Sequence, residues 1–245
     1  TGLSQHEIVT EGYQELTHPS VTVKFPLRGR PGESLLVWTT TPWTLTSNVA
    51  AAVGPDLTYA RVRQGEDVYY LSEGTLHMLQ GPYQVEGRLR GAEMNGWTYE
   101  GPFDDLPAQV QSGAPQAHRV VLWDEVGEEE GTGIVHIAPG CGAEDFQLGK
   151  DHGLPVLAPL EENGTFVDGV GWRSGRAVSE VAEPIFEDLR QRGRCYRVAD
   201  YTHRYPVCWR CAEELVVRLV DEWYVSMGQQ LDAPLEEIGE EDRAR

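Results

Sequence analysis

Glycine and proline recur along the whole chain, 27 and 15 times in 245 residues, and they divide it into short apolar runs. This spacing favours strands and turns over long helices. The length lies at the upper end of single-domain size and suffices for a substantial core. We therefore expect one compact, β-rich α/β domain with appendages.

Several apolar runs have the pattern of strands. They are residues 21–25, 35–38, 49–53, 58–63, 67–72, 119–123, 133–138 and 215–220. The consecutive runs between 49 and 72 predict a meander with a hairpin at Gly65. Residues 81–118 are rich in Gly, Pro and Gln, and they predict strand fragments joined by long surface loops.

Two segments have helical patterns. Residues 143–152 follow a Gly/Pro turn and carry two acids in the first turn, where acids suit the helix dipole. Residues 178–189 have apolar side chains at helical spacing, with Pro184 marking the true start or a bend and Gly193 a stop. The expected organisation is a lead-in ribbon at 1–30, a core at 31–200 and an exit segment at 201–245.

The formal net charge of −19 has the wrong sign for a protein that grips a long stretch of nucleic acid by its phosphates. Any RNA contact must therefore be local. Part of the acidic excess lies in the loop 124–130 and in the tail 221–245, and both predict solvated surface. No run reaches the roughly 20 apolar residues that span a bilayer, and no secretory pattern opens the chain, so we expect a cytoplasmic protein without membrane contact.

Three consecutive threonines follow the second apolar run, in the segment Val37-Trp38-Thr39-Thr40-Thr41-Pro42-Trp43-Thr44-Leu45. They bring hydroxyls and backbone groups to one place, while Pro42 fixes its own φ and holds Thr41 extended. The segment is a candidate wall of a polar pocket. An ordinary Thr-rich strand is the alternative.

A second segment joins a strand, a Gly/Pro turn and a helix start: Gly131-Thr-Gly-Ile-Val-His136-Ile-Ala-Pro139-Gly-Cys-Gly142-Ala-Glu-Asp145. Such a turn exposes backbone N–H groups at the end of a strand, where α/β proteins often hold ligands. His136 and Asp145 could then face one cavity. A structural histidine and a helix-capping aspartate are the alternatives.

Together, the two segments resemble a known family. TTTPWTL followed by GTGIVHxAPxxGxED is similar to the editing (connective-peptide) domain of isoleucyl-tRNA synthetases, a class I aminoacyl-tRNA synthetase family. Valyl and leucyl enzymes look like TTRPET or TTRPDT at the first segment, so Pro42-Trp43-Thr44 points to the isoleucyl branch. The resemblance extends from about Pro19 to Met227 and implies a twisted β-barrel editing domain with peripheral helices.

The activity implied by the resemblance is aminoacyl-tRNA deacylation, a proofreading step in protein biosynthesis. The chain would remove valine from the isoleucine tRNA, and from valyl-adenylate as a further substrate, by direct attack of water. It would not activate amino acids, because it has no HIGH or KMSKS signature and no phosphate loop. The implied partners are the 3′ end of the tRNA and the remainder of the synthetase.

The resemblance also implies roles for individual residues. Asp145 would hold the α-ammonium of the substrate. His136 would form a wall that limits side-chain size. The ester, the terminal adenosine and the attacking water would be positioned by Thr39, Thr40 and Thr41, with Trp38, Trp43 and Thr44 as further substrate-binding residues.

Other interpretations remain open. Cys141 lies five residues after His136, which makes a Cys–His hydrolase conceivable. A valyl- or leucyl-type editing domain and a non-catalytic tRNA-docking module are alternatives to an isoleucyl editor.

The Cys208-Trp-Arg-Cys211 pair has the spacing of half a zinc site, because a closed structural site needs four ligands. In the family this pair looks like half of a zinc knuckle whose partner lies upstream. Cys195 and His203 are candidates for a local completion. We expect no cofactor for editing and a zinc ion only in the full-length enzyme.

Overall fold

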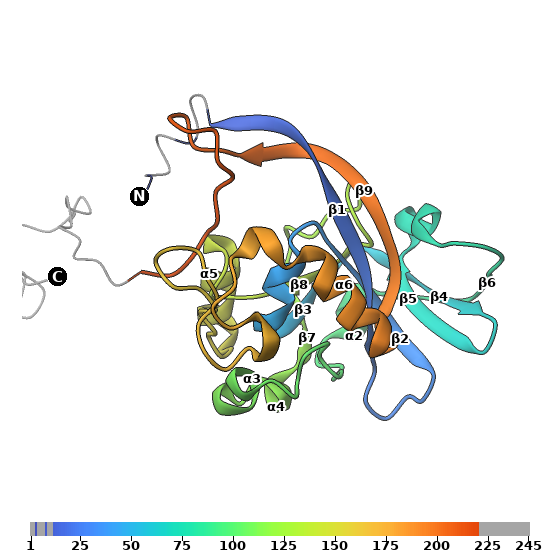
Figure 1. Cartoon of the computed structure of the whole chain (residues 1–245). Helices are drawn as coiled ribbons and strands as arrows, with labels where there is room; N and C mark the ends of the chain where they lie inside the picture. Colours follow the sequence, from blue (N-terminus) through green and yellow to red (C-terminus); the bar gives the residue numbers. More distant parts are fainter. Residues whose placement is uncertain (1–2, 4–7, 9–11, 221–245) are drawn as a thin grey trace, which may run out of the picture.

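The computed structural model describes Leu3, Ile8 and residues 12–220 (Figure 1). The acidic tail predicted at 221–245 lies outside these described residues. A six-stranded sheet has the order β6-β4-β5-β2-β1-β9, and a three-stranded sheet has the order β7-β3-β8. The strands are β1 (Tyr13–Pro26), β2 (Glu33–Thr39), β3 (Ala50–Val53), β4 (Thr58–Gln64), β5 (Asp67–Ser72), β6 (Gln84–Arg90), β7 (Arg119–Leu122), β8 (Ile134–Ile137) and β9 (Cys195–Pro206).

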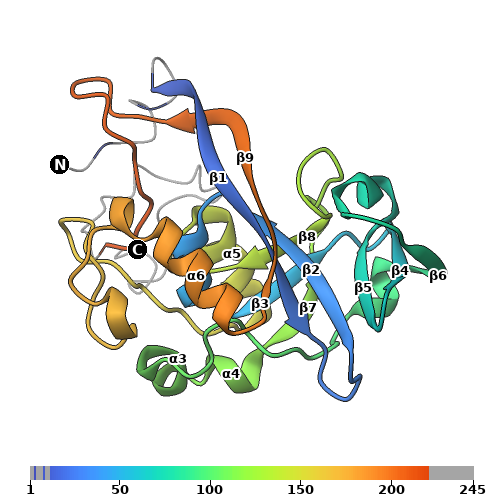
Figure 2. The same cartoon turned by 45° about the vertical axis from the view of Figure 1, so that its right-hand side comes forward.

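The helical elements are short and lie around the sheets (Figure 2). The α-helices are α2 (Gly91–Met94), α3 (Pro107–Ser112), α4 (Ala114–Ala117), α5 (Ala143–His152) and α6 (Ala182–Gln191). The 3-10 helices are η1 (Pro42–Ser47), η2 (Glu73–Met78), η3 (Gly171–Arg173) and η4 (Val178–Glu180).

β1 and β9 form a long antiparallel ribbon whose register runs from Tyr13↔Pro206 to Val23↔Cys195. The inner end of β1 buries Val21, Val23 and Phe25, while its outer end projects from the body (Figure 1). The strand expected at 21–25 is thus confirmed as part of β1. β9 was not predicted, because none of its side chains is fully buried and several are charged. The strand expected at 215–220 is wrong, since those residues have no regular structure. The expected boundary at 200/201 falls inside β9.

The predicted meander is correct for its second half. β4 and β5 form an antiparallel hairpin, with Gly65 in the turn at a φ of 62°. β3 does not join it and lies instead between β7 and β8 in the other sheet. All four residues of β3 are buried and three are alanines, which suits a central strand covered on both faces.

Residues 81–118 contain more helix than expected. β6 is a strand, as predicted, but α2, α3 and α4 replace the long loops. A proline occupies the first turn of both α3 and α4, where its missing N–H costs nothing. Helices of four to six residues are too short to show an apolar period.

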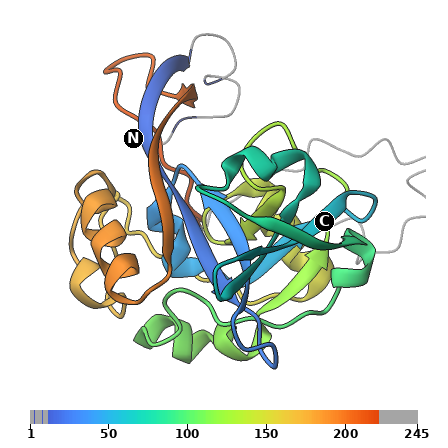
Figure 3. The same ribbon diagram turned by 90° about the vertical axis from the view of Figure 1, so that its right-hand side faces the viewer.

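Both longer predicted helices are confirmed. α5 spans the expected residues, and α6 begins near Pro184 and ends before Gly193. α6 buries Ile185, Phe186 and Leu189 and packs against η1 and the ribbon. Figure 3 shows α6 (orange) on one side of the ribbon and the strands β4 to β6 (teal) on the other.

The sheet-dominated α/β fold class is confirmed. In the described residues each sheet has two open edge strands, so closure into a barrel stays a prediction. β2 and β8 lie side by side and connect the two sheets (Figure 2). This contact brings the threonines at the end of β2 next to the turn that follows β8.

Candidate functional site

A pocket of about 890 Å³ opens where the two sequence motifs meet. Its size is that of a small-molecule site. Four segments and one further residue line it: the end of β2 with the start of η1, the loop 125–133, the strand β8, the turn into α5, and Leu57 between β3 and β4. The lining residues predicted from the sequence are Trp38, Thr39, Thr40, Thr41, Thr44, His136 and Asp145.

The three threonines form one wall of the pocket. The Oγ1 atom of Thr39 accepts the backbone N–H of Thr41 at 3.0 Å and lies 3.2 Å from the Thr41 hydroxyl. Thr41 has a φ of −117° and ψ of 69°, as the following Pro42 requires a non-helical residue there. The chain therefore turns sharply out of β2 and presents hydroxyls rather than continuing the strand.

His136 has a neutral ring with a defined tautomer. The Thr44 hydroxyl donates to the Thr41 carbonyl at 2.8 Å and lies 2.8 Å from His136 Nε2. Since the hydroxyl has one hydrogen, Nε2 must donate to it and Nδ1 must be unprotonated. Nδ1 is buried without a hydrogen-bond partner. Burial lowers the pKa of His136 to about 4. The ring is thus neutral at pH 7, and its Nδ1 acceptor has no partner in the described residues.

Asp145 lies in the first turn of α5 and reaches back across the turn that precedes the helix. Its Oδ2 atom accepts the N–H of Ala138 at 2.7 Å. Burial raises the pKa of this carboxyl group, the Ala138 hydrogen bond opposes the shift, and the neighbouring Glu144 adds to it. A destabilised carboxylate in a pocket is typical of a functional group. Glu144 is exposed and does not line the pocket.

The two tryptophans of the first motif have different surroundings. Trp38 lines the pocket and contacts Tyr201 of β9 edge to face at 4.9 Å. Trp43 belongs to the hydrophobic core and does not line the pocket. The structure therefore separates Trp43 from the other predicted site residues.

The acidic loop was missed as part of the site. The sequence predicted this loop to be solvated surface. In the structure, four of its glutamates also line the pocket: Glu125, Glu128, Glu129 and Glu130. Its position between two buried strands, directly before the second motif, was the available signal. Glu125, Glu129 and Glu130 are exposed, so the prediction of solvated surface holds for them. Because charge runs are usually surface, the sequence alone did not indicate that they also line the pocket.

Cys141 also lines the pocket, but its surroundings disfavour the reactive thiolate form. Burial raises its pKa to about 12, although a hydrogen bond with Ser47 opposes the shift. His136 Nε2 is engaged with Thr44, and the neutral thiol is a weak nucleophile. The geometry does not support a Cys–His hydrolase.

Cys208 and Cys211 lie in the turn after β9. Hydrogen bonds from the backbone of Cys211 and Arg210 lower the pKa of Cys208. Cys195 and His203 do not complete a site, because eight residues of β9 place them roughly 26 Å apart. Within residues 12–220, no three His, Cys, Asp or Glu side chains are arranged to hold a metal ion.

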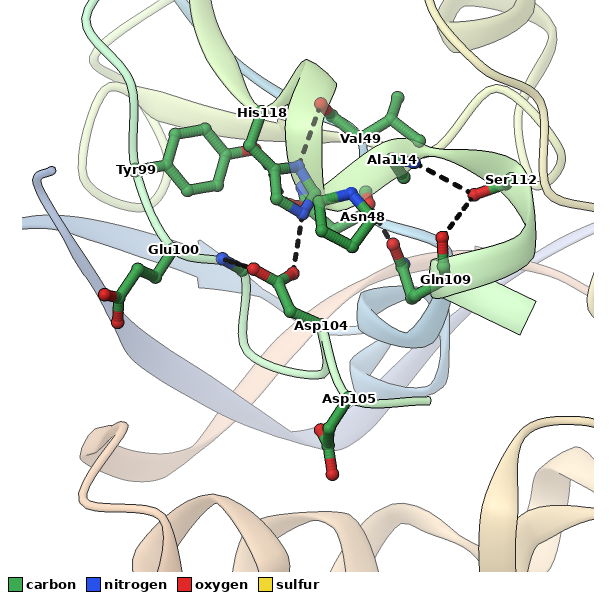
Figure 4. Close-up of polar contacts among 12 residues, drawn as sticks. Asn48, Val49, Tyr99, Glu100, Asp104, Asp105, Gln109, Ser112, Ala114 and His118 are labelled. Carbon is green, nitrogen blue, oxygen red and sulfur yellow. Dashed lines mark hydrogen bonds and ion pairs between the residues drawn. The ribbon is translucent and has the colours of Figure 1, made fainter. Parts of the chain in front are cut away.

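A second polar cluster, also missed from the sequence, lies where the neighbouring strands β3 and β7 begin (Figure 4). His118 Nδ1 donates to the Val49 carbonyl at 3.0 Å, and Nε2 lies 2.7 Å from Asp104 Oδ1. The ring stacks on Tyr99 at 4.9 Å, and the Tyr99 hydroxyl donates to Asn48 at 2.8 Å. These contacts hold the start of β3, directly after η1.

No helix in the described part of the chain is long and apolar enough to cross a membrane.

No family model matches the chain. Three similar proteins are isoleucine–tRNA ligases, from Methanothermobacter thermautotrophicus (40% identical over 227 residues), Pyrococcus abyssi (38% over 251) and Streptomyces avermitilis (40% over 242). The matches cover 92%, 98% and 97% of this chain, in the same order. They cover only 21%, 23% and 22% of the three ligases, so this chain corresponds to about a fifth of their length.

Two solved structures share the fold. A crystal structure of GlLeuRS-CP1 aligns with a TM-score of 0.56 at 15% identity, over 74% of this chain and 99% of that chain. The editing domain of the P. falciparum cytosolic leucyl-tRNA synthetase aligns with a TM-score of 0.53 at 9% identity, over 74% and 99%. At these identities the likeness concerns the fold alone.

Proposed function

Since this chain is homologous over nearly its whole length to one segment of the isoleucine–tRNA ligases and has the fold of a synthetase editing domain, we propose that it removes valine from the isoleucine tRNA by hydrolysis. The observation that carries the proposal is the pocket that joins Thr39, Thr40 and Thr41 to His136 and Asp145. The proposed location is the cytoplasm, and the proposed partners are the tRNA 3′ end and the rest of a synthetase.

The physical need for such a site is well defined. A hydrophobic pocket distinguishes ligands that differ by one methylene by only about 1–3 kcal/mol, and valine against isoleucine is the standard case of this limit. A second site that admits valine and refuses isoleucine supplies the missing discrimination. His136 is suited to this wall, because it is buried and its ring is fixed by Thr44.

The proposed reaction is direct hydrolysis of an ester. The oxygen of water bonds to the acyl carbon, and the bond between that carbon and the ribose oxygen breaks. One proton of the water goes to the leaving ribose oxygen and the other to solvent, which leaves a free carboxylate. Asp145 anchors the α-ammonium of the substrate through a charge-assisted contact. The threonine hydroxyls donate hydrogen bonds as negative charge develops on the carbonyl oxygen. Editing in this scheme needs no metal, and zinc at Cys208 and Cys211 belongs to a longer protein that supplies two further ligands.

Deacylation assays with three charged tRNAs test the proposal. The chain should release valine from the isoleucine tRNA, and it should leave isoleucine on the same tRNA intact. Release of threonine from the valine tRNA at a higher rate would identify a valyl-type editor instead. If none of these tRNAs is deacylated, although the isoleucine tRNA still binds, the chain is a docking module without catalysis.

A further inference from the structure

The acidic loop lines one side of the pocket, and we call its residues 124–131 the strap. Glu128 fastens it on one side, where its Oε1 accepts the N–H of Gly74 at 3.1 Å and the hydroxyl of Ser72. On the other side, Gly131 packs against Trp38 so closely that an added Cβ would lie 2.7 Å from the ring. The φ of 67° at Gly131 also favours glycine. The strap is therefore a held wall of the pocket.

Glu130 gives the strap a further contact with the ribbon. Burial raises the pKa of Tyr201, and a hydrogen bond with Glu130 adds to the shift. Tyr201 in turn contacts Trp38 at 4.9 Å. Glu125 and Glu129, by contrast, are exposed, and within residues 12–220 neither side chain has an ion-pair or hydrogen-bond partner.

The charges on the pocket lining all have one sign. Five carboxylates line it, from Glu125, Glu128, Glu129, Glu130 and Asp145. The described lining contains no lysine or arginine. A concave site with charges of one sign concentrates ligands of the opposite sign and repels those of the same sign.

A second observation points to the same kind of ligand. His136 lines the pocket, is buried to more than nine-tenths with only 8% of its surface exposed, and has an Nδ1 acceptor without a partner. Glu125, Glu129 and His136 Nδ1 are thus acceptors without a partner in the described residues, whereas Glu128 and Glu130 are engaged. Since two of these three acceptors are carboxylates, a ligand with hydrogen-bond donors and a positive charge suits them best.

We propose that the acidic strap is an electrostatic filter, which favours binding of a cationic aminoacyl ester and disfavours a ligand that carries a carboxylate. This inference rests on the proposed function. An aminoacyl ester has an α-ammonium and no carboxylate, so its acyl end carries a charge of one sign. Hydrolysis adds water across the ester bond, releases a proton and converts that end into a zwitterion, whose new carboxylate lies in a pocket lined by acids. The same charges that attract the substrate then promote release of the free amino acid.

Binding of two matched probes tests the filter without requiring turnover. One probe is valine joined by an amide to the ribose of adenosine, and the other is the same molecule with its α-amine acetylated. Calorimetry should show tighter binding of the cationic probe by the wild-type chain. Glu125→Gln with Glu129→Gln should reduce this preference about fourfold, and about 1 M salt should abolish the difference between variant and wild type. Free valine should bind the double variant more tightly than the wild type.

Glu161→Gln with Glu162→Gln is the matched control, because both residues are exposed and lie outside the pocket lining. This control should retain the wild-type preference. An unchanged preference in the strap variant, or an equal change in the control, overturns the filter. Absence of deacylation by the wild-type chain would overturn the proposed function, while the probe preference would still decide the filter.

Discussion

Two buried histidines on either side of β3 have opposite hydrogen-bonding states. His118, just before β7, has partners at both nitrogens and a stacked tyrosine. His136, in β8, has one partner and an orphaned Nδ1. The sequence offers no reason to treat the two differently in burial or in charge. The difference indicates that the His118 cluster supports the fold, while His136 leaves an unpaired acceptor in the wall of the pocket.

The supporting cluster should give the largest effect on stability. His118→Ala removes two hydrogen bonds, leaves Asp104 without its closest partner and opens a cavity beside Tyr99. We expect the free energy of unfolding to fall by about 3–4 kcal/mol in urea titrations. His77→Ala, at an exposed position, should change it by less than about 0.5 kcal/mol. A loss of less than about 1 kcal/mol for His118→Ala would contradict the supporting role of the His118 cluster.

The pocket histidine should instead make stability depend on pH. Below pH 6.5 the unfolded chain protonates this histidine, whereas the folded ring resists protonation until about pH 4. The unfolded state therefore binds more protons in this window, and stability that is complete above pH 6.5 is lost as the pH falls toward 4. Between pH 7 and pH 4, wild type should lose up to about 3 kcal/mol more than His136→Gln. Parallel curves for the two proteins would contradict the burial of a neutral His136, and His77→Gln should follow wild type.

A smaller effect is expected on substrate choice. His136→Ala enlarges the pocket, so the ratio of the deacylation rates for valine and isoleucine should fall about tenfold. This is the discrimination that one methylene group gives in a hydrophobic pocket. Rates of deacylation on the isoleucine tRNA charged with each amino acid measure it. If the variant loses all activity on valine and still refuses isoleucine, the ring acts in the chemistry and not as a wall.

Removal of metal ions should change neither the stability that the His118 cluster provides nor the activity of the His136 pocket. Only two of four zinc ligands, Cys208 and Cys211, are near one another in the described chain. We expect substoichiometric zinc in the purified chain and unchanged deacylation after chelation. One tightly held zinc per chain, found by elemental analysis, would show that other residues of the chain complete the site.

Local patterns predicted the parts of the fold that depend on neighbours in the sequence. The β4–β5 hairpin at Gly65, the turn before α5 and the start of α6 near Pro184 follow from glycine, proline and apolar spacing. β9 was missed because its stability comes from pairing with β1, whose residues are about 180 positions away. No local period marks such a strand.

The site was predicted in the same uneven way. The two motifs indicated their residues, and the contact of β2 with β8 brings those residues into one pocket. The strap and the His118 cluster escaped prediction, because a glutamate run and a lone histidine have the same local sequence whether solvated or packed. Only the tertiary contacts show that these side chains are packed: Glu128 accepts the N–H of Gly74, and His118 contacts Asp104.

The central claim is that the pocket around Asp145 hydrolyses the valyl ester of the isoleucine tRNA. Asp145→Asn keeps an acceptor for the Ala138 N–H but removes the charge opposite the α-ammonium. Its kcat/KM for deacylation should fall roughly ten- to a hundredfold, because hydrogen bonds to charged groups contribute about 1.5–3 kcal/mol. The adjacent Glu144→Gln, outside the lining, should stay within about twofold of wild type. A fall for Glu144→Gln with a wild-type rate for Asp145→Asn would contradict the account.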